Sequence, residues 1–122
     1  MNISRNFLII GAAYLLIGVG FGIYMGASGD FALKGVHAHI NLLGFTLMTL
    51  FGLAYRLIPA LADNGLARAH FWLHQVGAGG TLLFLFLLLS GIAPQVAPLL
   101  PIFETLVALG IVAWLVNLTK NT

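Results

Sequence analysis

Long runs of apolar residues, separated by short polar or turn-forming stretches, dominate the chain. The first run, Phe7 to Ala27, contains no charged residue. The breaks that follow contain Ser28-Gly29-Asp30, then Pro59 with Asp63-Asn64-Gly65, then Pro94, Pro98 and Pro101. A helix crosses a bilayer with about 20 apolar residues. The pattern therefore predicts four transmembrane helices, at about residues 5–26, 33–58, 66–91 and 102–118.

The composition agrees with this membrane class. Hydrophobic residues make up 61% of the 122 residues and charged residues 7%, against roughly 45–50% and about 25% in soluble domains. The few dispersed charges, with a net charge of +2, exclude nucleic-acid binding. The chain has no Cys, which excludes disulfides, thiolate ligands and iron-sulfur clusters. We expect one all-α membrane domain over residues 1–122.

The basic residues predict how this domain crosses the membrane. Four spans place both termini and the central loop on one side, with Arg5, Arg56, Arg68 and Lys120, while Lys34 is on the other side. Cytoplasmic loops carry the excess of Lys and Arg. We therefore expect an up-down bundle with both termini in the cytoplasm, as a multi-pass protein of a bacterial inner membrane.

The second predicted span carries two histidines and an asparagine, although an imidazole at bilayer depth is costly unless something compensates it. On a regular helix, one small and polar stripe contains His37, Asn41, Gly44, Met48, Gly52 and Tyr55. His39 lies about 200° away from His37, on a leucine-rich face. His37 is thus the candidate ligand inside the bundle, whereas His39 faces lipid, the membrane surface or another subunit of a homo-oligomer.

The third predicted span offers a second histidine pair. His70 and His74 are four residues apart and share a helix face, an arrangement that presents two imidazoles to one metal. The alternative for His70 is a place in an aromatic belt beside Trp72. At about 1.5 Å per residue, His37 and His74 differ in depth by roughly 20 Å. They should not share one metal, so either two sites exist or one site takes its second ligand from Met25, a symmetry mate's histidine or water.

Two further features of the sequence could contribute to a cofactor-binding site. Glu104 is the only carboxylate within a span and lies level with His37, where it either orients the imidazole or extends to the outer headgroups. Gly18, Gly22 and Gly26 form a flat strip on the first span. Such a strip admits a neighbouring helix, which is the simpler interpretation, or a planar ligand.

The stretch from Gly35 to Gly77 resembles the catalytic subunit of haem-copper oxidases and nitric oxide reductases. The resemblance is carried by His39-Ile40-Asn41, by Pro59 about 20 residues later, and by Phe71-Trp72-Leu73 at the next span. It implies that His37 or His39 is an axial ligand of a low-spin haem near the outer side. The helices that carry that family's second axial ligand and copper ligands have no counterpart here, so reduction of oxygen or nitric oxide is not implied.

Three functions remain open. The leading hypothesis is a b-type haem protein with one or two haems, held by His37 or His39 with Asn41 and Gly44 nearby, that transfers electrons or handles haem or gas ligands. A quinone or a cytochrome would be its redox partner. The second is a copper or other metal-ion carrier that uses the two histidine pairs, and the third is a cofactor-free assembly subunit. No nucleophile, base and acid are arranged together, so enzyme activity stays open.

Overall fold

The computed structural model describes residues 1–122 and is entirely helical. Its elements in chain order are α1 (Ile3–Ser28), α2 (Lys34–His39), the π-helical segment η1 (Ile40–Thr46), α3 (Leu47–Leu57), the 3₁₀ turn η2 (Pro59–Leu61), α4 (Gly65–Leu89), the 3₁₀ segment η3 (Pro94–Leu99) and α5 (Leu100–Asn121). Four stretches are long and apolar enough to cross a membrane: Ile3–Ser28, Lys34–Leu57, Gly65–Leu89 and Pro94–Asn121. The predicted all-helical class and the four spans are confirmed.

Local residue chemistry sets the ends of these helices. The Asn2 side chain accepts a hydrogen bond from the Arg5 N–H, and the Asn64 side chain caps α4 in the same way by accepting from the Ala67 N–H. At the other end of α1, Gly29 adopts φ 71°, the left-handed conformation that a glycine takes at little cost. These caps place each polar turn between two apolar helices.

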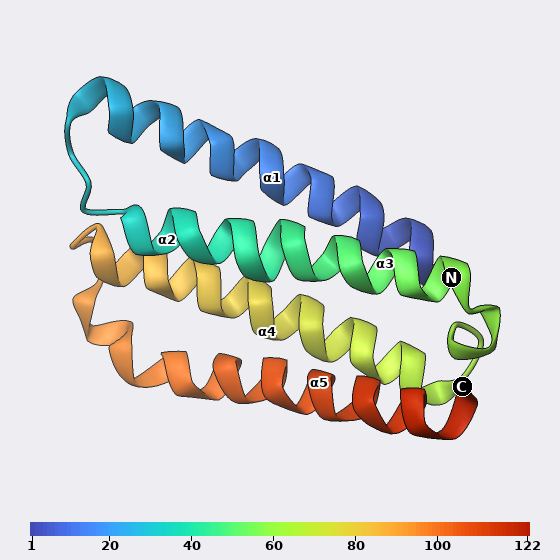
Figure 1. Ribbon diagram of the computed structural model, residues 1–122. Helices are drawn as coiled ribbons and strands as arrows, with labels where there is room; N and C mark the ends of the chain where they lie inside the picture. Colours follow the sequence, from blue (N-terminus) through green and yellow to red (C-terminus); the bar gives the residue numbers. More distant parts are fainter.

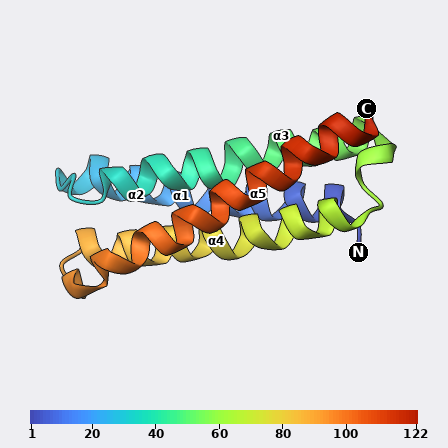
Figure 2. The same cartoon turned by 90° about the horizontal axis from the view of Figure 1, so that it is seen from below.

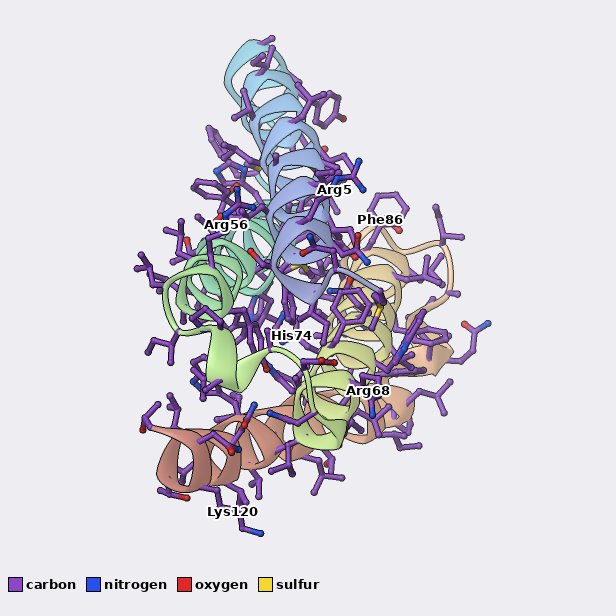
Figure 3. All side chains as sticks on the ribbon, turned by 90° about the vertical axis from the view of Figure 1, so that its right-hand side faces the viewer. Arg5, Arg56, Arg68, His74, Phe86 and Lys120 are labelled. Atoms are coloured by element: carbon purple, nitrogen blue, oxygen red, sulfur yellow. The ribbon has the colours of Figure 1, made fainter.

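The four spans lie side by side as an elongated molecule (Figure 1). α1 packs along η1 and α3, and α4 packs most extensively against α5. Both termini lie at the same end of the molecule in two perpendicular views (Figures 1 and 2). Viewed from that end, Arg5, Arg56, Arg68 and Lys120 come from four different helices (Figure 3).

The second span is not the regular helix that the sequence predicts. Directly after η1, the Leu47 N–H bonds to the carbonyl oxygens of Gly44 and Leu42 and not to that of Leu43, its α-helical acceptor. The Thr46 hydroxyl also donates to the Asn41 carbonyl, at 2.9 Å. Short π-helical segments of this kind free a backbone carbonyl from its α-helical partner. Here the carbonyl that loses this partner belongs to Leu43.

Glycines on two of the helices allow backbones to approach closely. A Cβ at Gly77 would lie 2.7 Å from the backbone nitrogen of Val107, so α4 and α5 touch there through main chain. On α1, Gly22 faces the His37 ring and Gly18 faces Asn41, whereas nothing lies within 4 Å of Gly26. The predicted strip is therefore a helix-packing surface over Gly18 and Gly22 and does not extend to Gly26.

The core is aromatic and the outer surface is aliphatic. Phe7, Phe51, Tyr55 and Phe71 are at most 7% exposed and belong to one cluster. Large apolar side chains such as Leu16, Ile23 and Leu57 are more than 60% exposed. Exposed aliphatic surface of this extent fits contact with lipid chains. The structure is that of a multi-pass membrane protein.

Candidate functional site

His37 uses both ring nitrogens in packing α2 against α1. Its Nδ1 lies 2.7 Å from the Gly18 carbonyl oxygen, which only accepts, so Nδ1 carries the proton and donates. Its Nε2 then accepts from the Asn41 side-chain amide, at 3.4 Å. The ring also packs on Gly22. His37 is part-buried against α1, and its lone pair is engaged with Asn41.

His39 leaves one ring nitrogen free at an exposed position. Its Nδ1 donates to the Gly35 carbonyl oxygen one turn earlier, at 2.7 Å, because a carbonyl can only accept. Nε2 therefore carries the lone pair and has no protein partner. An Nδ1 anchored on a backbone carbonyl, which fixes the tautomer and orients the ring, is the usual arrangement of a metal-binding histidine.

The His39 ring borders a cavity between the second span and the last two. The cavity has a volume of about 260 Å³, and its lining comes from η1, α4 and α5 as well as α2: His39, Leu42, Leu43, Thr81, Glu104 and Val107. The walls are mostly apolar, with an imidazole, a hydroxyl and a carboxylate as polar groups. Glu104 thus lines a cavity with His39, and its side chain is exposed, which fits the alternative that it extends outward more than a place against the His37 ring. We call this space the His39 cavity.

The other residues predicted for a site in this region are buried or packed between helices. Gly44 is buried where a Cβ would meet the Tyr14 ring, so it allows η1 to approach α1 closely. Met25 is 5% exposed near the end of α1. The Asn41 side-chain oxygen is buried next to Gly18 and has no hydrogen-bond partner.

His70 and His74 lie in the centre of the molecule, each with no solvent-accessible surface. The His74 label falls between the four spans in the end view of Figure 3. The Tyr55 hydroxyl lies 2.8 Å from His70 Nδ1. His74 Nε2 donates to the Leu43 carbonyl oxygen at 2.9 Å, which is the oxygen that η1 frees from its α-helical partner. The membrane-surface alternative for His70 is excluded, because Trp72 is 58% exposed while His70 is fully buried.

Each of these two imidazoles keeps one buried nitrogen without a partner, His70 Nε2 and His74 Nδ1. Because the Leu43 carbonyl can only accept, His74 Nε2 carries the proton and Nδ1 is a bare acceptor. When the Tyr55 hydroxyl donates to His70 Nδ1, His70 Nε2 is an N–H donor. The two unpaired atoms are then a donor and an acceptor, on rings whose centroids are 6.1 Å apart.

Aromatic rings from three helices enclose this pair. Phe51 lies edge-on to His70 at a centroid distance of 4.3 Å and also contacts His74 at 5.4 Å. Phe7 from α1 lies 5.3 Å from His70, and Trp114 from α5 lies at the same distance on another side. An unpaired polar atom in such surroundings is costly, which makes the two imidazoles candidates for a function.

The hydrogen bonds of two buried polar residues escape sequence reasoning. Tyr55 lies on the predicted stripe, but its bond to His70 joins two spans and needs the tertiary fold. Asn117 is fully buried near the end of α5, where its amide donates to the Leu61 carbonyl and its oxygen accepts from Asn64. An asparagine within an apolar run is the only sequence signal for it.

The histidines do not gather into a multidentate metal centre. No group of three or more His, Cys, Asp or Glu side chains is arranged to hold a metal ion. His37 bonds to the Gly18 carbonyl of α1, and His74 bonds to the Leu43 carbonyl of η1 within the core. A metal at any of these histidines would therefore take ligands from outside the chain or from a porphyrin.

No family model, no curated protein and no solved structure matches the chain. The functional interpretation rests on the geometry of these side chains.

Proposed function

We propose that the protein binds a b-type haem in the membrane, with His39 as an axial ligand. The observation that carries the proposal is the hydrogen bond from His39 Nδ1 to the Gly35 carbonyl, which leaves Nε2 bare and accessible. His37 is the weaker candidate because the Asn41 amide and the Gly18 carbonyl engage both of its nitrogens. The helical wheel favours His37 over His39, because it considers only which face of the helix a residue occupies and not its hydrogen-bond partners.

The residues around His39 fit a haem in chemistry but only partly in size. Leu42, Leu43 and Val107 provide apolar walls for a porphyrin, and Glu104 is a carboxylate on the far wall. The volume of about 260 Å³ is below the ~300–1,000 Å³ of typical ligand pockets. A haem held by His39 would therefore extend past the edge of one chain.

A second copy of the chain would complete such a site. His39 is exposed, and Leu42 and Leu50 of the same span are 54% and 56% exposed. A homo-oligomer that covers these side chains would let a residue of the other copy also hold the haem. Bound haem supplies a one-electron couple or a site for a gas molecule. The role we propose is electron transfer with a quinone or cytochrome, or the handling of haem or gas ligands.

For orientation, we propose an up-down bundle in a bacterial inner membrane with both termini in the cytoplasm. The support is the distribution of cations: Arg5, Arg56, Arg68 and Lys120 lie at the end with the termini, and Lys34 begins α2 at the opposite end. The chain contains no Cys, so single cysteines are unambiguous probes. An impermeant maleimide added to intact cells should label Asp30→Cys and not Asp63→Cys; the reverse pattern would overturn the orientation.

An absorption spectrum tests haem binding. The full chain is purified in detergent, supplied with haem, separated from free haem by gel filtration, and measured oxidised and reduced. We expect a Soret band that shifts on reduction and is lost in His39→Ala. His37→Ala is the matched control, with an imidazole removed two residues away, and should keep the band.

Two results would overturn the proposal. One is the absence of a retained Soret band in the wild-type protein. The other is an unchanged band in His39→Ala together with a lost band in His37→Ala, which would assign the haem to the interior stripe. Elemental analysis of protein purified without added metal tests the metal-carrier alternative, because a copper carrier would contain copper and no porphyrin.

A further inference from the structure

A surface groove follows the outer side of α4 near the end of the molecule that holds the termini. It has a volume of about 450 Å³, and its lining comes from α4 and, in one residue, from α5: Arg68, Ala69, Trp72, Leu73, Val76 and Leu106. Arg68 lies in the first turn of α4, and Val76 lies about 12 Å further along the helix, at about 1.5 Å per residue. The groove is therefore basic at the end nearest the termini and apolar along the rest. We call it the Arg68 groove.

We infer that the Arg68 groove binds a phospholipid with an anionic headgroup. The phosphate of this lipid pairs with the Arg68 guanidinium, and an acyl chain lies along Val76 and Leu106. The lipid comes from the leaflet at the end of the molecule with the termini. No residue of the groove lines the His39 cavity or is a proposed haem ligand, so the inference is independent of haem binding.

The charges of the chain leave Arg68 without an acidic residue in its groove, since no Asp or Glu belongs to the lining. Only three acidic residues exist in the chain. Asp63 lines a different cavity, which it shares with Arg56, and Glu104 lines the His39 cavity. The third, Asp30, precedes α2 at the opposite end. A guanidinium pairs with phosphate oxygens through two N–H groups at once, so an anionic headgroup supplies the charge that the chain does not place beside Arg68.

The place of Arg68 on its helix also favours a negatively charged partner. The first turn of α4 contains no acidic residue. This end of a helix carries partial positive charge, so a cation there is unfavourable and a bound anion offsets it. A zwitterionic headgroup would bring a second cation close to Arg68, which is why a lipid of net negative charge fits better.

The rest of the groove fits the part of the lipid below the phosphate. Trp72 follows Arg68 by one helical turn, and its side chain is 58% exposed. Tryptophan is enriched at the headgroup level of membranes, where the apolar rings pack on lipid and the indole N–H donates to a polar group. Val76, one turn deeper, is 51% exposed, and Leu106 adds an apolar side chain from α5. The order of cation, indole and aliphatic side chains thus matches the order of phosphate, glycerol esters and acyl chain.

Quenching of tryptophan fluorescence by brominated lipid tests the site, because Trp72 lines the groove. The full-length chain, purified without haem, is reconstituted in phosphatidylcholine bilayers with increasing fractions of a lipid that has brominated acyl chains, either phosphatidylglycerol or phosphatidylcholine. We expect the phosphatidylglycerol to reach half-maximal quenching at an about fivefold lower fraction, the preference that one basic residue near a charged headgroup provides. Arg68→Gln should abolish this preference. Arg5→Gln removes the same charge from α1 at the same end of the molecule and should keep it (Figure 3).

A second pair of variants tests the apolar part of the groove. Val76→Phe fills it and should lower the amount of phosphatidylglycerol that the protein retains in detergent, measured by native mass spectrometry. Val112→Phe, at a similarly exposed position of α5 outside the groove, should retain lipid like the wild type. Equal quenching of the wild type by the two brominated lipids would overturn the inference, as would equal retention by the two valine variants. An equal loss of preference in Arg68→Gln and Arg5→Gln would also overturn it, because the net charge of the whole end would then attract the lipid.

Discussion

The close approach of α4 and α5 at Gly77 gives a prediction whose magnitude follows from the structure. In Gly77→Ala, the added Cβ would lie 2.7 Å from the Val107 nitrogen and 2.9 Å from the Phe103 oxygen. Both are backbone atoms, which cannot move aside as the end of a side chain can. Overpacking of this kind costs about 1–3 kcal/mol, and the rigid neighbours favour the upper part of that range.

Gly79→Ala, on the same helix, isolates this cost. The Cβ of Gly79→Ala would have only the Tyr14 hydroxyl oxygen near it, at an ordinary 3.7 Å. Both substitutions gain up to about 1 kcal/mol of intrinsic helix propensity, so that gain cancels in the comparison. The free energies of unfolding of the two variants should therefore differ by about 1–3 kcal/mol, the overpacking cost itself.

Equilibrium unfolding in mixed detergent micelles measures the difference. Tryptophan fluorescence is a suitable signal because Trp114 is partly buried against the core while Trp72 is 58% exposed. We expect Gly77→Ala to unfold at a lower fraction of denaturing detergent than the wild type, and Gly79→Ala at an equal or higher one. Equal stability of the two variants would refute the close packing of α4 on α5 at this position.

Three other stability predictions use the same assay. Asn64→Ala removes the cap of α4 and the bond to Asn117, and should cost about 1–2 kcal/mol or more; a neutral result would contradict the capping role. Ser4→Ala removes the buried 2.9 Å bond to the Gly52 carbonyl and should cost about 1 kcal/mol, so an unchanged stability would contradict the role of this bond. Gly18→Ala should be destabilising because the new Cβ would overlap Asn41, whereas Gly26→Ala has open space and should not be; equal effects would contradict the packing of α1 on η1.

The four spans are predictable from sequence because hydropathy alone determines them. The observed elements Ile3–Ser28 and Gly65–Leu89 begin and end within about two residues of the predicted helices. The last helix starts earlier and continues further than predicted, as α5 (Leu100–Asn121), because Pro101 is accepted in its first turn. The π-helical segment was not predicted, since its residues have no composition that distinguishes it from an α-helix.

The histidines show where sequence reasoning ends. The i, i+4 spacing of His70 and His74 predicts that they share a face, and they do face the core together. Their partners are a tyrosine on another span and a backbone carbonyl, neither of which any spacing rule names. The wheel correctly turns His37 inward, yet it cannot reveal that Gly18 and Asn41 engage both of its nitrogens.

The irregular helix η1 lies between the proposed haem ligand His39 and the buried histidine His74. Its altered hydrogen bonding frees the Leu43 carbonyl, and that carbonyl fixes the tautomer of His74 in the core. The same segment begins directly after His39, which the Gly35 carbonyl holds with Nε2 exposed. If η1 were a regular α-helix, the Leu43 oxygen would also accept from the Leu47 N–H, and His74 would share this acceptor with the backbone. A ligand at His39 that alters the bonding of η1 would therefore act on the hydrogen bond that orients His74 in the core.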